Sequence, residues 1–240
     1  MTENKIQTFY EKEANIYDLT RFKSSHGLYE DFVQKSAVLE LLGDCKGKRI
    51  LEIGSGTGRF TKDLVSHGAS VVCVDLSRTM HEQSRSSINN SSVEYFVMSG
   101  LDLAFEDASF DCCLTVNMMS HIKNSHKLFL EVCRVLKKDG SFVANFPNLS
   151  SLYFPIGGFV NLFERSIQVP VYSRWYSVSE VMCSLKSSGL EPVKACGRMI
   201  FPKKYCPAPL FVCLKAINSK ISRYSFLSGD LFVRSIRCNQ

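Results

Sequence analysis

Short apolar runs alternate with longer amphipathic stretches along most of the chain, and this alternation predicts an α/β protein. Seven runs, several of them rich in β-branched residues, are expected as strands, at 49–53, 70–75, 93–98, 110–116, 141–146, 190–196 and 230–237. The run at 110–116 is apolar without interruption after Asp111, as is typical of a central parallel strand buried on both faces. Strands that alternate with helices predict a doubly wound, mostly parallel sheet.

The spacing of apolar residues predicts helices ahead of the first strand and between the strands. The first segment carries apolar residues at helical spacing, namely Ile6, Phe9, Tyr10, Ala14 and Tyr17. A second helix is expected at 28–42, before Gly43. Further helices are expected at 58–67, after the N-cap Ser77, at 124–136 with Asn124 as N-cap, at 177–189 and, with a basic face, at 210–224.

Three glycines at every second position follow the first predicted strand, at Gly54, Gly56 and Gly58. Glycine tolerates positive φ and lets the backbone approach a ligand closely, and the helix that follows points free N–H groups past the strand end. The second predicted strand ends at Asp75, 21 residues after Gly54, near the spacing of a carboxylate that binds ribose hydroxyls. Arg59 stands where a dinucleotide-binding loop would have its third glycine, so a pyrophosphate loop fits less well. The alternative is a structural turn beside a surface aspartate.

Composition is that of a globular protein of one domain, with 240 residues of which 45% are hydrophobic. We expect neither a signal peptide nor a membrane anchor, because the first twelve residues are polar and no apolar run approaches about 20 residues. The ten cysteines form no C-x-x-C pair and several lie in predicted strands. They indicate reduced core residues of a cytoplasmic protein, with neither disulfides nor a metal site.

The net charge of +6 is unevenly distributed. Residues 1–147 carry 17 Lys and Arg against 19 Asp and Glu, whereas residues 148–240 carry 12 against 4 and hold 13 of the 27 aromatic residues. A basic, aromatic segment suits an anionic substrate, a membrane surface or nucleic acid, and the alternative is a merely solvated face.

Four motifs resemble those of the class I S-adenosylmethionine (SAM) dependent methyltransferases, in particular the small-molecule group of ubiquinone and menaquinone biosynthesis. They are LEIGSGTG at 51–58, VDLS at 74–77 with Met80, LAFEDASFD at 103–111 and VLKKDG at 135–140. The resemblance covers residues 5–150 and implies a seven-stranded Rossmann-like sheet with an antiparallel last strand. It also implies one methyltransferase domain, with cofactor-covering helices at 1–43, a SAM-binding core at 44–147, and lid insertions plus the last strands at 148–240.

The glycine loop, Asp75 and the resemblance together imply SAM as cofactor and a set of candidate binding residues. These are Tyr17, Arg21, Glu52, Gly54, Ser55, Gly56, Gly58, Asp75, Leu76, Met80, Ser99, Gly100, Leu101 and Asn117. Tyr17 and Arg21 resemble a Tyr-Asp-x-x-Arg pattern of the family, although Arg21 also suits an exposed surface. Relatives usually carry an acid after the third strand that accepts the adenine amino group, whereas this chain has Ser99, so backbone groups near Gly100 and Leu101, or Asp102, are the alternatives.

His121 is the candidate catalytic base. It follows the predicted strand at 110–116, where open α/β sheets bind ligands, and imidazole titrates near neutral pH. A pocket-lining or structural histidine is the alternative.

We expect transfer of a methyl group to a small, hydrophobic or anionic acceptor by in-line displacement. Residues 149–176 are aromatic and are expected to form a lid, and the basic segment suggests peripheral contact with a membrane through Lys203, Lys204, Lys215, Lys220 and Arg223. A nucleic-acid methyltransferase is a second hypothesis, disfavoured because no Asn-Pro-Pro-Tyr type motif follows the fourth strand. A non-catalytic SAM-binding module is the third.

Overall fold

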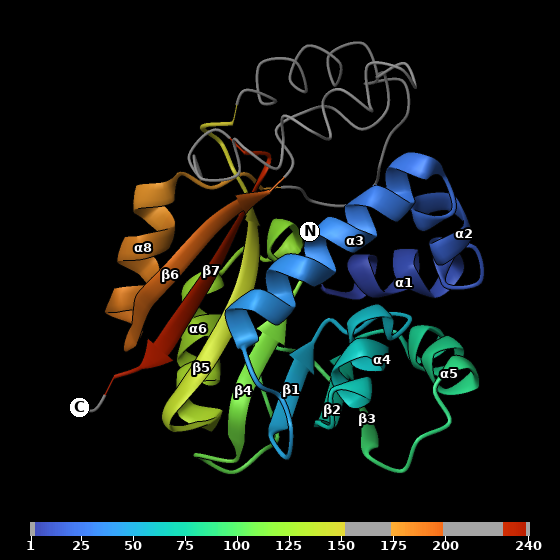
Figure 1. The fold of residues 1–240 in the computed structure, drawn as a ribbon, viewed down its shortest axis with the longest axis horizontal. Helices are drawn as coiled ribbons and strands as arrows, with labels where there is room; N and C mark the ends of the chain where they lie inside the picture. The colour runs from blue at the N-terminus through green and yellow to red at the C-terminus, as the bar shows by residue number, and fades with distance from the viewer. Residues whose placement is uncertain (1–2, 152–173, 199–227, 239–240) are drawn as a thin grey trace.

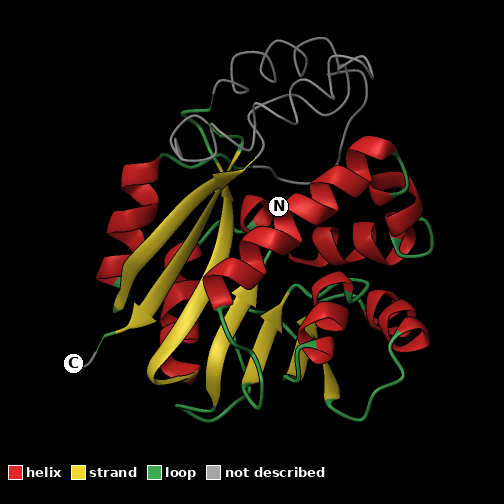
Figure 2. Ribbon diagram, viewed as in Figure 1, coloured by secondary structure: helices red, strands yellow, loops and turns green. Residues whose placement is uncertain are grey.

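Seven strands form one twisted sheet with helices on both faces (Figures 1 and 2). The computed structural model describes residues 3–151, 174–198 and 228–238. The helices are α1 Glu3–Glu13, α2 Tyr17–Phe22, α3 Ser25–Leu42, α4 Arg59–Ser66, α5 Arg78–Ser87, η1 Met119–His121 (a 3-10 turn), α6 Ser125–Val135 and α8 Val178–Ser187. The strands are β1 Arg49–Ile53, β2 Ser70–Asp75, β3 Val93–Val97, β4 Phe110–Thr115, β5 Leu136–Pro147, β6 Leu190–Arg198 and β7 Asp230–Arg237.

The strand order is β3-β2-β1-β4-β5-β7-β6, and β7 runs antiparallel between β5 and β6. The five strands β1 to β5 are parallel. The expected doubly wound sheet with an antiparallel last strand is thereby confirmed. The order reverses between β1 and β4, and open α/β sheets bind their ligands at such a reversal, beyond the carboxyl ends of the strands.

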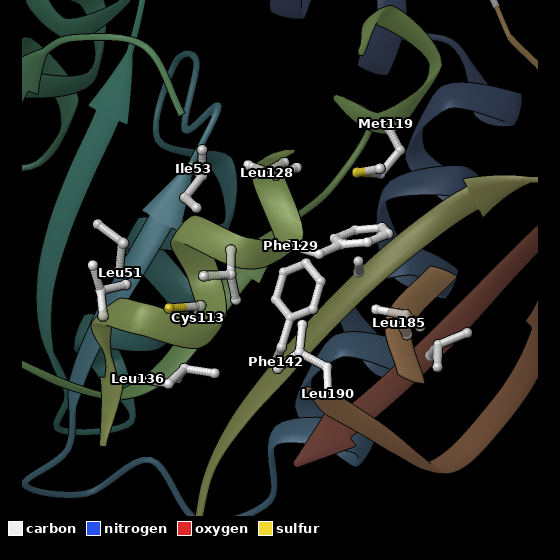
Figure 3. Packing of buried hydrophobic residues seen from close by; sticks show 14 of the residues in the cluster. Leu51, Ile53, Cys113, Met119, Leu128, Phe129, Leu136, Phe142, Leu185 and Leu190 are labelled. Carbon is white, nitrogen blue, oxygen red and sulfur yellow. The ribbon is translucent and has the colours of Figure 1, made fainter. Parts of the chain in front are cut away.

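Successive residues of each central strand enter different cores on the two faces of the sheet. On β1, Ile50 packs into a core with α3 and α4, whereas Leu51 and Ile53 pack into a core with α6 and α8. Figure 3 shows the second core, in which the Phe129 and Phe142 rings meet edge to face with centroids 6.0 Å apart. Burial on both faces explains why these strands are apolar without alternation.

The structure corrects the bounds of several predicted elements. The helical spacing from Ile6 to Tyr17 does not produce one helix, because the chain turns after Glu13, where the Ile16 amide donates to the Glu13 carbonyl, and buries Ala14. The helix predicted at 28–42 begins at Ser25, since the Ser24 hydroxyl accepts from the Gly27 amide as N-cap. The strand predicted at 141–146 begins at Leu136, because Leu136 already pairs with Phe110.

Most of the basic, aromatic third lies outside the described residues. The lid expected at 149–176 is described only at its two ends, and the basic helix expected at 210–224 falls wholly outside, as do the five basic residues named for membrane contact. Among the described helices, none has the length and apolar character needed to cross a membrane.

Candidate active site

A cavity of about 240 Å³ lies at the carboxyl ends of β1, β2 and β4, and residues of α1 line it. This volume lies just below the range for small-molecule sites, roughly 300–1,000 Å³. The described residues that line it are Glu3, Ile6, Gln7, Tyr10, Tyr17, Ile53, Gly54, Gly56, Val74, Asp75, Leu76, Ser77, Met80, Met98, Gly100, Leu101, Val116, Asn117, Met118, His121, Ile122, Lys123 and Asn124. Ten of the fifteen predicted site residues therefore lie in one wall: Tyr17, Gly54, Gly56, Asp75, Leu76, Met80, Gly100, Leu101, Asn117 and His121.

The glycine loop adopts the positive φ angles that the sequence predicts, with φ of 73° at Gly54, 54° at Gly56 and 81° at Gly58. A Cβ at Gly54 would lie 2.8 Å from the Met118 sulfur, so this position also needs glycine for space. At Gly56 a Cβ would meet no atom within 4 Å, because the cavity lies beside it. The loop therefore leaves space for a ligand beside the Gly56 backbone, whereas Gly54 and Gly58 pack closely against side chains.

Asp75 joins the glycine loop to the next helix while it faces the cavity. Its Oδ2 accepts from the Gly56 amide at 2.9 Å and its Oδ1 accepts from the Ser77 amide at 2.9 Å. Burial raises the pKa of Asp75 above its usual value, and the hydrogen bonds from Ser77 and Gly56 oppose that rise. The carboxylate is thus fixed in orientation before any ligand arrives.

Glu52, Ser55 and Gly58 do not line the cavity as the described residues define it, although all three were predicted as cofactor-binding. The Glu52 carboxylate accepts from the Thr61 hydroxyl at 2.6 Å, and burial raises its pKa to about 8. Ser55 Oγ lies 3.2 Å from His81 Nε2. Gly58 caps α4, where an added Cβ would collide with Ser84. These three residues stabilise the loop on the side away from the cavity.

Arg21 and Ser99 also lie outside the cavity wall that the structure describes. The Arg21 guanidinium lies over the Tyr17 ring, 4.6 Å from its centroid. Ser99 Oγ accepts from the Leu101 amide at 3.0 Å and donates to Glu3 Oε1 at 2.5 Å. The serine therefore holds an acid rather than facing the cavity itself.

Glu3 is a cavity residue that the sequence interpretation missed. It brings a carboxylate from α1 to the end of β3, where relatives were expected to have an acid and this chain has Ser99. The two residues are 96 positions apart, so no local motif could have revealed the pair.

Helix α1 has no fully buried residue, and both polar and ring contacts hold it over the cavity. Glu11 accepts from the Arg78 amide at 2.9 Å and the Thr79 amide at 3.2 Å, at the N-terminus of α5, where a negative charge is favourable. Tyr10, one residue earlier, brings its hydroxyl 2.8 Å from His121 Nε2.

A polar network connects α3 and α4 to Asn117 in the cavity wall. Arg59 donates to Asp31 Oδ1 and to Gln34 Oε1, each at 2.7 Å. Gln34 Nε2 in turn donates to Asn117 Oδ1 at 3.2 Å, and the Asn117 amide donates to Asn145 Oδ1 at 2.7 Å. This network fixes Asn117 at a φ of 59°, a conformation that asparagine tolerates better than most residues.

The described end of the expected lid is attached to the segment that carries His121. The buried Tyr176 donates its hydroxyl to the Met119 carbonyl at 2.9 Å, and the Arg174 amide donates to the Ser120 carbonyl at 2.9 Å. Arg174 also pairs with Glu180 at the start of α8. The segment 119–121 is thus held from both sides, by α1 and by the chain that leads into α8.

Comparisons with known proteins agree with this architecture. A family profile described as "Methyltransferase domain" matches residues 51–144. The demethylmenaquinone methyltransferase of Tropheryma whipplei is 26% identical over 207 residues, which span 78% of this chain and 84% of that protein.

Two solved structures share the fold over nearly the whole chain. A SAM-dependent methyltransferase of Thermotoga maritima, described as a possible histamine N-methyltransferase, is 20% identical with a TM-score of 0.69, covering 96% of this chain and 99% of that one. Magnesium protoporphyrin IX methyltransferase of Synechocystis PCC 6803, solved with bound SAH, is 10% identical with a TM-score of 0.70, covering 98% of this chain and 100% of that one.

The cavity fits SAM by its own chemistry. The oriented Asp75 carboxylate suits the ribose of SAM, and the glycine backbone at Gly56 suits its amino-acid end. Met80 gives an apolar cover that suits the flat adenine base. The matched motifs, the sheet order and the comparisons lead to one assignment: the chain carries a SAM-dependent methyltransferase domain, matched over residues 51–144, and is distantly similar to the ubiquinone and menaquinone C-methyltransferases.

Proposed function

We propose that the protein methylates a small, hydrophobic or anionic acceptor bound in the cavity beside His121. The observation that carries this proposal is the cavity itself, which joins nine of the fourteen predicted cofactor residues and His121 in one largely apolar wall. The first acceptor to test is a prenylated hydroquinone, by analogy with the demethylmenaquinone methyltransferase that the chain resembles at 26% identity.

The apolar wall supports this choice of acceptor class. Ile6, Val116, Met118 and Ile122 line the cavity together with His121. Such a wall suits an apolar ring, because the ring displaces water from apolar surface when it binds.

The protein has to orient and desolvate the acceptor more than it has to take part covalently. Bound SAM supplies an activated methyl group whose positive charge disappears on transfer. The chain's residues hold the acceptor in line, exclude water and remove a proton from an acceptor that carries one, and His121 is the proposed final base.

The experiment is a turnover assay with purified protein and SAM, in which formation of SAH, the demethylated cofactor, is measured by mass spectrometry. A prenylated 1,4-naphthohydroquinone is expected to be methylated, and a structured RNA is not. Methylation of the RNA, with an affinity that falls steeply with salt, would overturn the proposal in favour of a nucleic-acid enzyme. SAM binding without turnover of any acceptor would favour a non-catalytic module.

Contact with an anionic membrane and a cytoplasmic location are further proposals that rest on the sequence. The five basic residues from Lys203 to Arg223 and the aromatic residues of 148–240 support membrane contact, and the cysteines in predicted strands, with no C-x-x-C pair, support a cytoplasmic location. Co-sedimentation with phosphatidylserine vesicles at low salt, lost at high salt and in a variant with the five charges removed, is the expected result. An absence of binding at low salt would exclude membrane contact.

A further inference from the structure

Tyr10 and His121 form a hydrogen-bonded pair inside the cavity. The Tyr10 hydroxyl lies 2.8 Å from His121 Nε2, and both side chains line the wall. They come from α1 and η1, 111 residues apart. The pairing therefore exists only when α1 is docked over the sheet.

The Tyr10 phenol keeps its proton through the neutral pH range. Burial raises its pKa well above the ordinary value, and Tyr17, Asp75 and Glu13 add to the rise while Arg21 opposes it. A phenol with such a pKa is a weak base and a weak acid by itself. It can accept a proton only if it gives up its own at the same time.

The phenol also controls access to His121. A neutral imidazole nitrogen that accepts a hydrogen bond has one lone pair, and a Tyr10 hydroxyl that donates to Nε2 occupies it. An acceptor in the cavity then meets the oxygen of Tyr10 before it meets Nε2. The oxygen keeps lone pairs of its own, so it can accept a hydrogen bond while it donates one.

We propose that Tyr10 takes the acidic proton of the methyl acceptor while it passes its own proton to His121 Nε2. The acidic O–H or activated C–H bond of the acceptor breaks as a new O–H bond forms on Tyr10, and the former Tyr10 O–H bond breaks as Nε2–H forms. Tyr10 ends neutral, His121 ends as imidazolium, and the electron pair stays on the acceptor, on the deprotonated atom or delocalised onto a conjugated carbon, for methylation. This inference rests on the proposed function.

The relay narrows the class of acceptor. A hydroxyl, a phenol or an activated carbon acid must lose a proton to become a strong nucleophile, whereas a neutral amine already has a lone pair. The pair therefore favours transfer to oxygen or carbon. Glu11 acts as a positioning residue, because its bonds to the start of α5 fix the helix turn that carries Tyr10.

The first test needs no acceptor. In 15N NMR of the protein alone at neutral pH, His121 Nε2 is expected to be the unprotonated nitrogen, and Tyr10→Phe is expected to shift the ring toward the Nε2–H tautomer. A wild-type ring that carries hydrogen on Nε2 would overturn the relay whatever the acceptor is.

The second test is turnover of the prenylated 1,4-naphthohydroquinone. Tyr10→Phe is expected to lower kcat by about 100-fold or more, with the SAM dissociation constant within about twofold of wild type. His121→Asn is expected to cause a similar loss, and the double variant no further loss, because the two groups act as one unit. Tyr95→Phe is the matched control, since it removes a phenol oxygen that bonds Ser84 outside the cavity, and its kcat should not change.

The outcomes separate the two proposals. A wild-type protein that is active on the hydroquinone while Tyr10→Phe is equally active would overturn the relay alone. A wild-type protein that is inactive on the hydroquinone would overturn the proposed acceptor and, with it, the substrate of the relay.

Discussion

At the scale of single residues, Asp75 connects structure and binding, because its carboxylate holds the glycine loop and faces the cavity at once. Asp75→Asn keeps the size but places an amide N–H₂ where one backbone amide now donates. We expect SAM to bind at least about tenfold more weakly, since charged hydrogen bonds contribute roughly 1.5–3 kcal/mol each. Isothermal titration calorimetry measures this, with Asp107→Asn on the surface as control. Unchanged affinity would remove Asp75 from the site.

Glu3 provides a second test at this scale. Its carboxylate lies in the cavity wall and accepts from Ser99, so it is oriented to accept one more hydrogen from a ligand amino group. Glu3→Gln is expected to weaken SAM binding about threefold to tenfold, because a neutral amide is a poorer acceptor than a carboxylate. Fluorescence titration measures the loss, and Glu82→Gln on the exposed side of α5 is the control. Equal SAM affinity for Glu3→Gln and wild type would show that α1 covers the ligand without a hydrogen bond from Glu3 to it.

These residues also show how far the sequence predicts the site. The glycines, Asp75, Met80 and Asn117 follow strands directly, so periodicity and motif spacing place them at one sheet edge. Glu3 reaches the same wall from a distant helix, and its docking depends on side-chain contacts that no local pattern encodes. Glu52 stands inside the motif yet points away from the cavity, because the alternation of a strand sends every second side chain to the other face. Ser55 lies in the loop after the strand, and its hydroxyl contacts His81.

At the scale of elements, the capping residues identified in the sequence mark the helix starts correctly. Ser77, Asn124 and Ser177 each accept from the amide three residues ahead, as expected. Glu180, the residue whose amide bonds the Ser177 hydroxyl, also pairs with Arg174 through its carboxylate. The break between α1 and α2 was not predicted, since tertiary docking of Asn15 to Gln83 and burial of Ala14 override a helical pattern that continues through them.

The glycine loop and the start of α5 contain two buried titratable groups with opposite effects on stability. Burial raises the pKa of Glu52 to about 8 and lowers the pKa of His81 to about 4. The folded state therefore binds more protons than the unfolded state at Glu52 between about pH 4.5 and 8, so that contribution to stability falls as pH rises. His81 acts in the other direction, and its contribution is lost as pH falls from about 6.5 toward 4.

Glu52→Gln isolates the first effect. The amide resembles the protonated acid and can still accept from Thr61, so we expect nearly wild-type stability near pH 4, where the wild-type carboxyl is protonated in both the folded and the unfolded state. Between pH 6.5 and 8 the wild type should lose up to about 1.4 kcal/mol of unfolding free energy per pH unit relative to the variant. Urea denaturation across this range measures the difference, and Glu94→Gln, which is exposed, should keep the wild-type slope. If the unfolding free energies of wild type and Glu52→Gln changed equally with pH, the result would contradict the prediction that Glu52 is protonated in the folded state.

At the scale of the whole molecule, the cofactor is expected to stabilise a fold whose cover is weakly attached. Helix α1 buries no residue of its own, so ligand contacts from below should contribute to its docking. SAM at 100 times its dissociation constant is expected to add about 2.7 kcal/mol, a rise in Tm of about 5–10 °C for a chain of this length. NADH at equal concentration should give no rise, since Arg59 replaces the third glycine of a dinucleotide loop. A larger shift with NADH than with SAM would contradict the assignment of the loop.

The position of strand β7 means that the sheet cannot be completed until this late part of the chain has been synthesised. It follows both β5 and β6 in the chain, yet it fills the gap between them, and in the described sheet β6 pairs with β7 alone. Until residues 230–237 emerge, β5 presents an open hydrogen-bonding edge beside a large apolar core, which invites pairing with other nascent chains. A stop codon or a protease cut just before Asp230 would thus do more than trim an edge, because it would detach β6 as well and turn the product into an aggregation-prone fragment.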